Sequence, residues 1–150
     1  MDVVDRKILR LLQANAKQNT KQIAQQVGLS VSPTYERIKR LEQSGCIKKY
    51  VAIIDGNQIG KSITVYCQIS LSNHSRKLID AFIMAIQGLP EVMGCSHVSG
   101  NYDFLLKVTA KDMNEYQQFV IDKLSVIDGI SNVQSSFEMN EIKEGISHNF

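Results

Sequence analysis

Residues Thr20–Tyr50 read TKQIAQQVGLSVSPTYERIKRLEQSGCIKKY, and this stretch decides what the N-terminal part of the chain forms. Its first part has apolar residues at helical spacing, namely Ile23, Ala24 and Val27. Gly28 is expected to end that helix, because glycine takes the left-handed C-terminal conformation without steric cost. Ser30 or Ser32 can then cap a second helix, with Pro33 in its first turn, where a missing N–H is not needed.

The second predicted helix has an apolar face and a polar face. The apolar face carries Thr34, Ile38 and Leu41, and the opposite face carries Pro33, Glu36, Arg37 and Arg40. A helix, a glycine turn and a helix with a basic outer face make the helix-turn-helix geometry that places a recognition helix in the DNA major groove. The candidate DNA-binding residues are Ser32, Pro33, Tyr35, Glu36, Arg37, Lys39, Arg40, Lys48 and Lys49.

Each candidate role has a plainer alternative. Arg37 and Arg40 can read guanine through paired hydrogen bonds, whereas Lys39 is suited to the phosphate backbone. Glu36 either reads cytosine or restrains a neighbouring arginine. The alternative is that Arg37 and Arg40 only pair with Glu36 and Glu42 on a solvated helix face.

The net charge of +2 hides an uneven distribution. Residues 1–50 hold ten Lys and Arg against four Asp and Glu, whereas residues 51–150 hold seven against eleven. The basic part suits a polyanion such as double-stranded DNA, because phosphates attract Lys and Arg and release counterions. Two modules with different partners are therefore expected.

The composition is typical of a globular protein, with 43% apolar and 21% charged residues. The sequence has no apolar run long enough to span a membrane, and its acidic start is unlike a signal peptide. The three cysteines are far apart, which favours reduced thiols over a disulfide framework. We therefore expect a cytoplasmic protein without a membrane partner.

One further helix completes the N-terminal domain. Asp2–Gln13 is predicted to be a helix capped by Asp2, and its apolar stripe is Val4, Ile8, Leu11 and Leu12. Thr20 is expected to cap the next helix, and Gly45 to end the third, which begins near Ser32. Three helices with apolar stripes predict a small bundle around one core.

Extended chain is predicted to follow this bundle. Cys46–Tyr50 begins an exit strand or wing, so residues 1–50 are assigned to a three-helix (winged) helix-turn-helix domain. Residues 51–61 are assigned to a linker strand, which contains the turn signal Asp55-Gly56-Asn57.

Residues 62–71, SITVYCQISL, alternate between apolar and polar and predict a strand with one buried face. The elements predicted after it are a helix over 75–87, strands over 92–99 and 103–110, a helix over 113–124 and a strand over 130–142. This βαββαβ order predicts a ferredoxin-like domain over residues 62–150, with both helices on one face of an antiparallel sheet. The other face, which carries Tyr66, is expected to be covered by a second subunit. The fold class is therefore α+β.

These segments also resemble the Lrp/AsnC, or feast/famine, family of regulators. Three N-terminal motifs carry the resemblance: D-x-x-D-x-x-I-L (Asp2–Leu9), I-A-x-x-V-G-L-S (Ile23–Ser30) and R-I-K-R-L-E-x-x-G-x-I (Arg37–Ile47). In the second half, S-G-N-Y-D-F-L-L-K-V (Ser99–Val108) is similar to the family's G-x-Y-D turn. The resemblance covers essentially the whole chain.

The resemblance implies a DNA-binding transcription regulator whose C-terminal domain dimerises and assembles to a tetramer or octamer. It implies that an amino acid or related metabolite binds between dimers, near the G-x-Y-D turn and the last strand. The effector-binding positions implied are Ser99, Gly100, Asn101, Tyr102, Asp103, Gln134, Ser135 and Ser136. The alternative is an architectural or assembly protein that binds DNA without a small-molecule effector.

Other functions have less support in the sequence. Gly100–Asp103 is also ordinary hairpin chemistry, in which Asp103 satisfies the backbone donors of a turn. An enzyme is not expected, because the three histidines lie far apart and no phosphate loop or nucleophile elbow is present. No cofactor or metal is therefore predicted. An assembly module with a purely structural helix bundle is the rival class, which the charge distribution disfavours.

Overall fold

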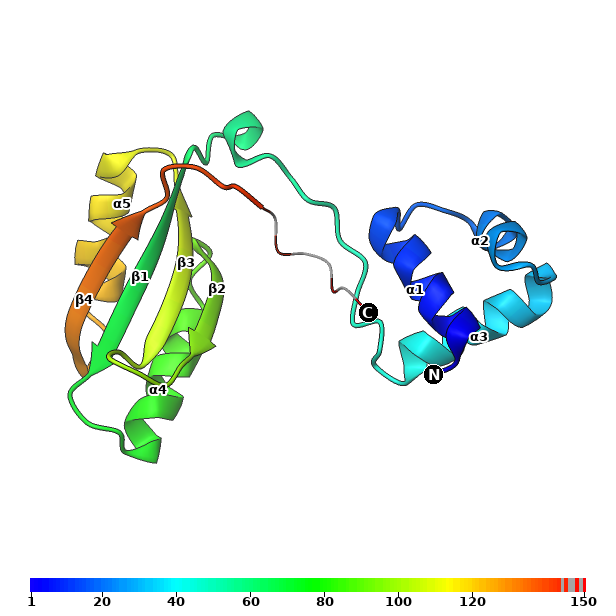
Figure 1. Ribbon diagram of the computed structural model, residues 1–150. Coiled ribbons are helices and arrows are strands. Elements are labelled where there is room, and N and C mark those ends of the chain that lie inside the picture. Colours follow the sequence, from blue (N-terminus) through cyan, green and yellow to red (C-terminus); the bar gives the residue numbers. More distant parts are fainter. Residues whose placement is uncertain (144, 146–147, 149) are drawn as a thin grey trace. The chain divides into compact units, whose positions relative to one another are not determined.

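The computed structural model describes residues 1–143, 145, 148 and 150. The chain forms two compact units, one built on Met1–Ile53 and the other on Ile54–Lys143 (Figure 1). No described helix is long and apolar enough to cross a membrane.

The N-terminal unit contains three helices, α1 (Val3–Ala14), α2 (Thr20–Val27) and α3 (Val31–Gln43). Their apolar stripes meet in a core formed by Ile8, Leu9, Ile23 and Leu41. The predicted stripe of α1 is confirmed at Ile8, which is fully buried, and the charged Asp5 is buried beside it. The three-helix bundle expected from the sequence is therefore confirmed.

The helix ends show which polar residues act as caps. Gly28 ends α2 in the left-handed conformation, with φ 75°, as expected. Thr20 was the wrong cap, because it is the first helical residue and Asn19 accepts the N–H of Gln22 instead. At α3 the N-cap is Ser30, which makes no side-chain capping bond.

The described chain has no strand directly after α3. Cys46 and Ile47 form a bend and residues 48–55 belong to no helix or strand, so the exit strand predicted from Cys46 and the linker strand predicted over 51–61 are not formed within this chain. A strand requires a neighbour whose N–H and C=O groups complete the ladder. A short 3-10 helix, Gly56–Ile59, follows and leads to the sheet.

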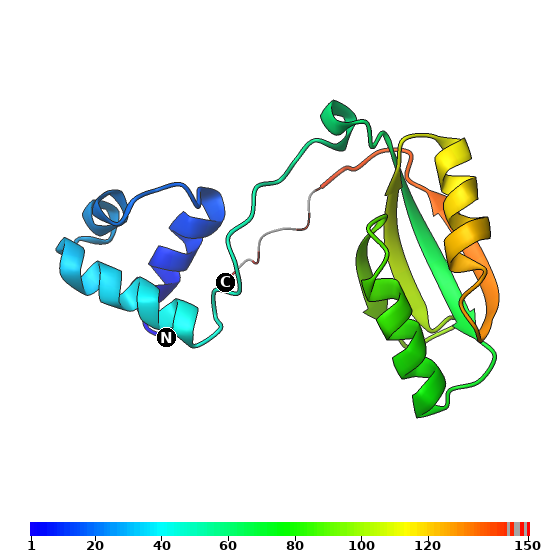
Figure 2. The same ribbon diagram turned by 180° about the vertical axis from the view of Figure 1, so that it is seen from behind.

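The C-terminal unit is a four-stranded antiparallel sheet with the order β2-β3-β1-β4 (Figure 1). Its strands are β1 (Ile63–Leu71), β2 (Val92–His97), β3 (Phe104–Ala110) and β4 (Ile130–Phe137). Helices α4 (Arg76–Gln87) and α5 (Met113–Phe119) cover one face of the sheet (Figure 2). The predicted ferredoxin-like fold is therefore confirmed.

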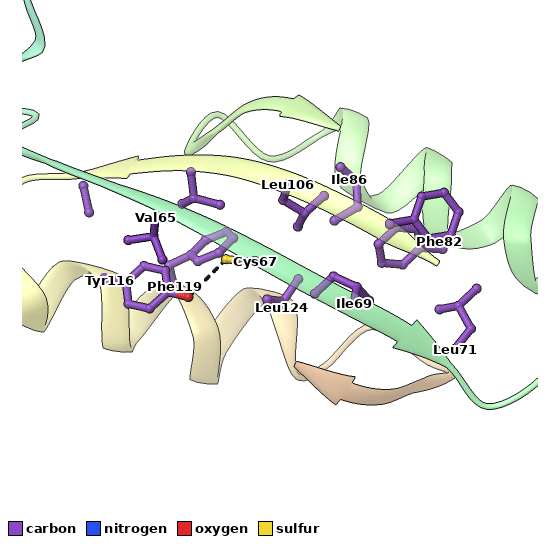
Figure 3. Close-up of a cluster of buried hydrophobic side chains, with 13 residues drawn as sticks. Val65, Cys67, Ile69, Leu71, Phe82, Ile86, Leu106, Tyr116, Phe119 and Leu124 are labelled. Atoms are coloured by element: carbon purple, nitrogen blue, oxygen red, sulfur yellow. Dashed lines mark hydrogen bonds between the residues drawn. The ribbon is translucent and has the colours of Figure 1, made fainter. Parts of the chain in front are cut away.

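The core of this unit lies between the sheet and its helices. Val65, Cys67 and Ile69 alternate with half-buried residues along β1, which confirms the predicted inward face. These side chains pack against the aromatic rings of Phe82 on α4 and Phe119 on α5 (Figure 3). Burial of such side chains contributes most of the driving force for folding.

Two predicted strand ends in the C-terminal unit were wrong. The strand predicted to reach residue 142 ends at Phe137, where its ladder with β1 stops opposite Val65. The strand predicted to reach Ser99 ends at His97, where the chain turns. The helix predicted over 113–124 is confirmed in extent, with an α-helix to Phe119 that continues as a π-helix over Val120–Leu124.

Candidate nucleic-acid interface and effector site

The outer face of α3 is open to solvent at nearly every candidate DNA-binding position. The exposed candidates are Ser32, Pro33, Tyr35, Glu36, Lys39, Arg40, Lys48 and Lys49, and Arg37 is half-buried. A shallow hollow on this face is lined by Pro33, Glu36, Arg37, Lys39, Arg40 and Gln43. The structure therefore gathers the α3 candidates on one accessible surface.

The two α3 arginines contact carboxylates that were not predicted as their partners from the sequence. Arg37 Nη1 lies 2.6 Å from Asp2 Oδ2 and 2.7 Å from Asp5 Oδ1. Arg40 Nη2 lies 3.1 Å from both carboxylate oxygens of Asp5. The predicted alternative named Glu36 and Glu42 as partners, but the ion pairs of Arg37 and Arg40 run to the start of α1.

The same carboxylates also cap α1. Asp2 Oδ1 accepts the Asp5 N–H at 2.8 Å, and Asp5 Oδ2 accepts the Asp2 N–H at 3.1 Å. This capping box satisfies helix donors and places negative charge where the helix dipole favours it. One pair of acids therefore starts α1 and ties it to α3.

These contacts shift the pKa values of the charged groups. Burial alone would raise the pKa of Asp5, but the Asp2 N–H and the Arg37 guanidinium outweigh it and lower the pKa. The Asp5 N–H is the main cause of the lowered pKa of Asp2, and Arg37 adds to it. Hydrogen bonds to Asp2 and Asp5 raise the pKa of Arg37. The pKa shifts of Asp2, Asp5 and Arg37 therefore all favour the charged forms of these side chains.

Two tyrosines, Tyr35 on α3 and Tyr50 after it, contact charged side chains. Lys39 Nζ lies 6.0 Å from the centre of the Tyr35 ring, at the outer limit of a cation–π contact. The Tyr50 hydroxyl donates to Glu42 at 2.8 Å, and burial together with this bond raises the pKa of Tyr50 to about 12. Glu42 is therefore engaged away from the arginines of α3.

The candidate effector turn, Ser99–Asp103, connects β2 to β3. Gly100 has φ 144°, which a residue with a side chain rarely adopts. Asp103 Oδ2 accepts the Leu71 N–H at 2.7 Å, and its backbone N–H donates to the Ile69 carbonyl at 2.8 Å. The turn is therefore braced against the end of β1.

The candidates on β4 do not share one face of the sheet. Ser135 pairs with Cys67 and faces the helices, where its hydroxyl contacts the Tyr116 hydroxyl. The Tyr116 hydroxyl also lies 3.1 Å from Cys67 Sγ, as the dashed line in Figure 3 shows. Burial raises the pKa values of Cys67 and Tyr116, so both stay neutral.

Gln134 and Ser136 lie on the opposite, uncovered face of the sheet, since they pair with Gln68 and Tyr66 of β1. Strand β1 lies between β3 and β4. A single chain therefore does not bring the Ser99–Asp103 turn and the β4 candidates into one pocket.

The uncovered sheet face combines polar and aromatic side chains. The Tyr66 hydroxyl donates to Glu138 at 2.9 Å, and Lys107 Nζ lies 5.8 Å from the centre of the Tyr66 ring. Tyr66, Gln68 and Lys107 are each only half-buried. Within the described residues, no group of three or more potential metal-ligating side chains comes together.

Two family profiles match this chain. The profile described as "Lrp/AsnC ligand binding domain" matches residues 64–147, and the profile described as "Winged helix-turn-helix DNA-binding" matches residues 1–48. The DNA-binding transcriptional activator DecR of Escherichia coli K12 is 35% identical over 143 residues, covering 95% of this chain and 94% of that protein. Transcriptional regulator AzlB of Bacillus subtilis is 36% identical over 147 residues, covering 98% and 94%.

Solved structures match both units. An AsnC family transcriptional regulator from Agrobacterium tumefaciens aligns with a TM-score of 0.93 and 34% identity, over 99% of this chain and 97% of that one. A transcriptional regulator from Neisseria meningitidis, solved as a complex with L-Met, aligns with a TM-score of 0.91 and 31% identity, over 96% and 93%.

Proposed function

This chain belongs to the Lrp/AsnC family of transcription regulators, and we propose that α3 reads operator DNA while an amino acid bound by the C-terminal unit modulates that binding. The work of such a protein is recognition of DNA and not chemistry on a substrate. We propose that the protein is cytoplasmic and acts on DNA there.

The exposed basic surface of α3 carries the DNA-binding part of the proposal. Arg40 has 63% of its side chain exposed and lines the same hollow as Lys39, and Lys48 and Lys49 are exposed in the segment after α3. Arginine forms two parallel hydrogen bonds with guanine in the major groove, whereas lysines neutralise phosphates. We assign base reading to Arg40 and phosphate contacts to the lysines.

The Ser99–Asp103 turn carries the effector part. An amino acid needs donors for its carboxylate and an acceptor for its ammonium group. Backbone N–H groups around Gly100 suit the first need, because glycine has no side chain to cover the backbone and, among the described residues beyond its chain neighbours, no atom lies within 4 Å of where a Cβ would stand. Asp103 is engaged with Leu71, so we assign it to holding the turn in shape. The L-Met complex of the Neisseria regulator supports an amino acid as the class of ligand.

A second copy of the chain completes this arrangement. The half-buried Tyr66, Gln68 and Lys107 form a sheet face that a partner's sheet can cover, which leaves the turn and β4 of different copies free to meet. A dimer also presents two recognition helices at a fixed spacing, which a two-fold operator matches. Higher assembly to a tetramer or octamer would bring effector sites between dimers.

The experiment is a fluorescence anisotropy titration of the full chain. The probes are a short duplex that the protein selects from a randomised pool and a scrambled duplex of the same composition. We expect a preference for the selected duplex, a steep loss of affinity with salt, and a change of about fivefold or more with one of the common amino acids. Equal affinity for both duplexes would contradict the proposal that α3 recognises a specific DNA sequence.

The competing function is an architectural DNA-binding protein without an effector. Such a protein would also bind DNA through the α3 surface. It would differ from the proposed regulator only in binding no amino acid at the Ser99–Asp103 turn. Isothermal titration with each common amino acid separates the two, together with light scattering of the same samples. The absence of heat, of a melting shift and of a mass change across the panel would reject the amino-acid effector and favour the competitor.

A further inference from the structure

We propose that Asp5, which lies on α1 outside the recognition helix, is a positioning residue that sets the guanidinium of Arg40 for reading bases. This inference rests on the proposed function of α3 in binding DNA. Asp5 would touch no base and no phosphate, because only 3% of its side chain is exposed. It would act on DNA specificity through the arginine that it holds.

The first step is the geometry of the Asp5–Arg40 pair. Arg40 Nη2 is 3.1 Å from each oxygen of Asp5, yet 63% of the Arg40 side chain is exposed. One end of the guanidinium is therefore anchored to a buried carboxylate while the rest faces water. Guanidinium is a planar group with five N–H donors in a rigid arrangement, so holding Nη2 against both oxygens of Asp5 restricts where the remaining donors can point.

The second step is the rigidity of the anchor. Asp5 Oδ1 also accepts from Arg37 at 2.7 Å, and Oδ2 accepts the Asp2 N–H at 3.1 Å. A buried carboxylate held by several donors has little freedom to turn, and leaving it unpaired is strongly unfavourable. Arg40 is thus held against a fixed group and not against another mobile side chain.

The third step separates the two arginines. Arg37 has 27% of its side chain exposed, and its Nη1 is shared between Asp2 and Asp5. Arg37 therefore closes the junction of α1 and α3, and Arg40 is the arginine left to face DNA. Two arginines that look equivalent in the sequence receive different roles from the same acid.

The consequence is a gain in selectivity more than in affinity. Ordering a long side chain before binding removes an entropic penalty that would otherwise be met on the DNA. A fixed fork also fits one arrangement of base acceptors, whereas a mobile one accommodates several. Removal of the Asp5 charge would meanwhile favour phosphate contact in general, because a carboxylate near DNA is repulsive.

The test is the change Asp5→Asn in the full chain, with Asp2→Asn as the matched control. Asp2 pairs with Arg37, whereas the described side chains form no hydrogen bond or ion pair between Asp2 and Arg40, and 52% of the Asp2 side chain is exposed. Anisotropy titrations use the duplex selected by the wild-type protein and its scrambled counterpart. We expect Asp5→Asn to lower the ratio of affinity for the selected duplex to affinity for the scrambled duplex about tenfold. The loss should come from weaker binding to the selected duplex, with equal or tighter binding to the scrambled one. Asp2→Asn should change the ratio less than threefold.

The change Arg40→Ala provides the second arm. If Asp5 acts through Arg40, Asp5→Asn lowers selectivity in the wild-type background and has no further effect once Arg40 is alanine. A merely structural role of Asp5 would weaken binding to both duplexes together and would do so in both backgrounds. That result, or an unchanged ratio in Asp5→Asn, overturns the proposal.

A spectroscopic measurement on the wild-type protein tests the inference without depending on whether a variant folds. We expect nitrogen-15 NMR of the free protein to show slowed rotation of the Arg40 guanidinium, relative to the exposed Arg76. Equally fast rotation of both would overturn the inference. If the wild-type protein prefers no duplex, the proposed function fails at the outset. If it is selective but Asp5→Asn is equally so, only this inference fails.

Discussion

His74 Nε2 lies 2.7 Å from Asp103 Oδ1, so the residues that follow β1 contact the turn that precedes β3. The other oxygen of Asp103 accepts the Leu71 N–H. Both oxygens of this carboxylate are thus used to hold the Ser99–Asp103 turn against the end of β1. The candidate effector site is attached to β1, one of the two inner strands of the sheet, and is not a loosely tethered hairpin.

The Asp103 carboxylate should stabilise the fold only where it is ionised. The Leu71 N–H is the main cause of its lowered pKa, and His74 adds to the effect. A group whose pKa is lowered by folding contributes stability above its unfolded value of about 3.9, and the contribution is lost as the pH falls through the folded value. We expect Asp103→Asn to lower the free energy of unfolding by about 1 kcal/mol at neutral pH.

Denaturant unfolding of Asp103→Asn and wild type across the acid range measures this effect. The difference between the two proteins should be constant above about pH 5 and should shrink below about pH 4. The control is His74→Ala, which keeps the Leu71 bond and should have the smaller effect. A pH-independent difference would show that the charge of Asp103 is not responsible.

Tyr116→Phe should remove a buried polar link without changing the packing. The Tyr116 hydroxyl contacts Cys67 Sγ and Ser135, whereas its ring packs edge-on against Phe137 at 5.3 Å between centres. We expect the unfolding free energy to fall by about 1 kcal/mol, because the hydroxyl partners lose a hydrogen bond inside the protein.

Thermal unfolding measures this change, with Tyr66→Phe as the control. The Tyr66 hydroxyl bonds Glu138 on the uncovered sheet face, where water can replace it, so its loss should matter less. Equal melting shifts for Tyr116→Phe and Tyr66→Phe would contradict the role given to the buried link.

Gly129→Ala should be among the most destabilising small changes in the C-terminal unit. Gly129 has φ 87°, and an added Cβ would lie 2.2 Å from a methyl group of Leu78 on α4. Left-handed strain and the steric contact together should reduce the unfolding free energy by about 3 kcal/mol. Gly60→Ala is the matched control, because Gly60 has φ 73° with nothing within 4 Å and adds only the strain. A similar loss in both variants would show that the Leu78 contact is relieved without cost.

The parts of the fold that could be predicted are those determined by residues close together in the sequence. Alternation along β1 identified its buried face, and Gly28 marked the end of α2 because its backbone conformation demands glycine. The exact ends of β2 and β4 could not be predicted, since each strand ends with its last ladder pair, His97 with Phe104 for β2 and Phe137 with Val65 for β4. That information lies in the partner strand and not in the strand itself.

The candidate site was predictable in its residues and not in their partners. The exposed face of α3 follows from helical periodicity, whereas the pairing of Arg37 and Arg40 with Asp5 joins residues more than thirty positions apart. The inward direction of Ser135 likewise depends on its register with Cys67. The positions proposed for operator and effector binding remain predictions for the experiments above.

The most direct test of the central claim compares Arg40→Ala with wild type on the selected duplex over a range of salt concentrations. We expect wild-type affinity to fall steeply with salt, and Arg40→Ala to lose about 1–3 kcal/mol of binding free energy while its light-scattering mass is unchanged. Superimposable binding curves for the two proteins at every salt concentration would contradict the assignment of Arg40 on α3 as the residue that reads DNA.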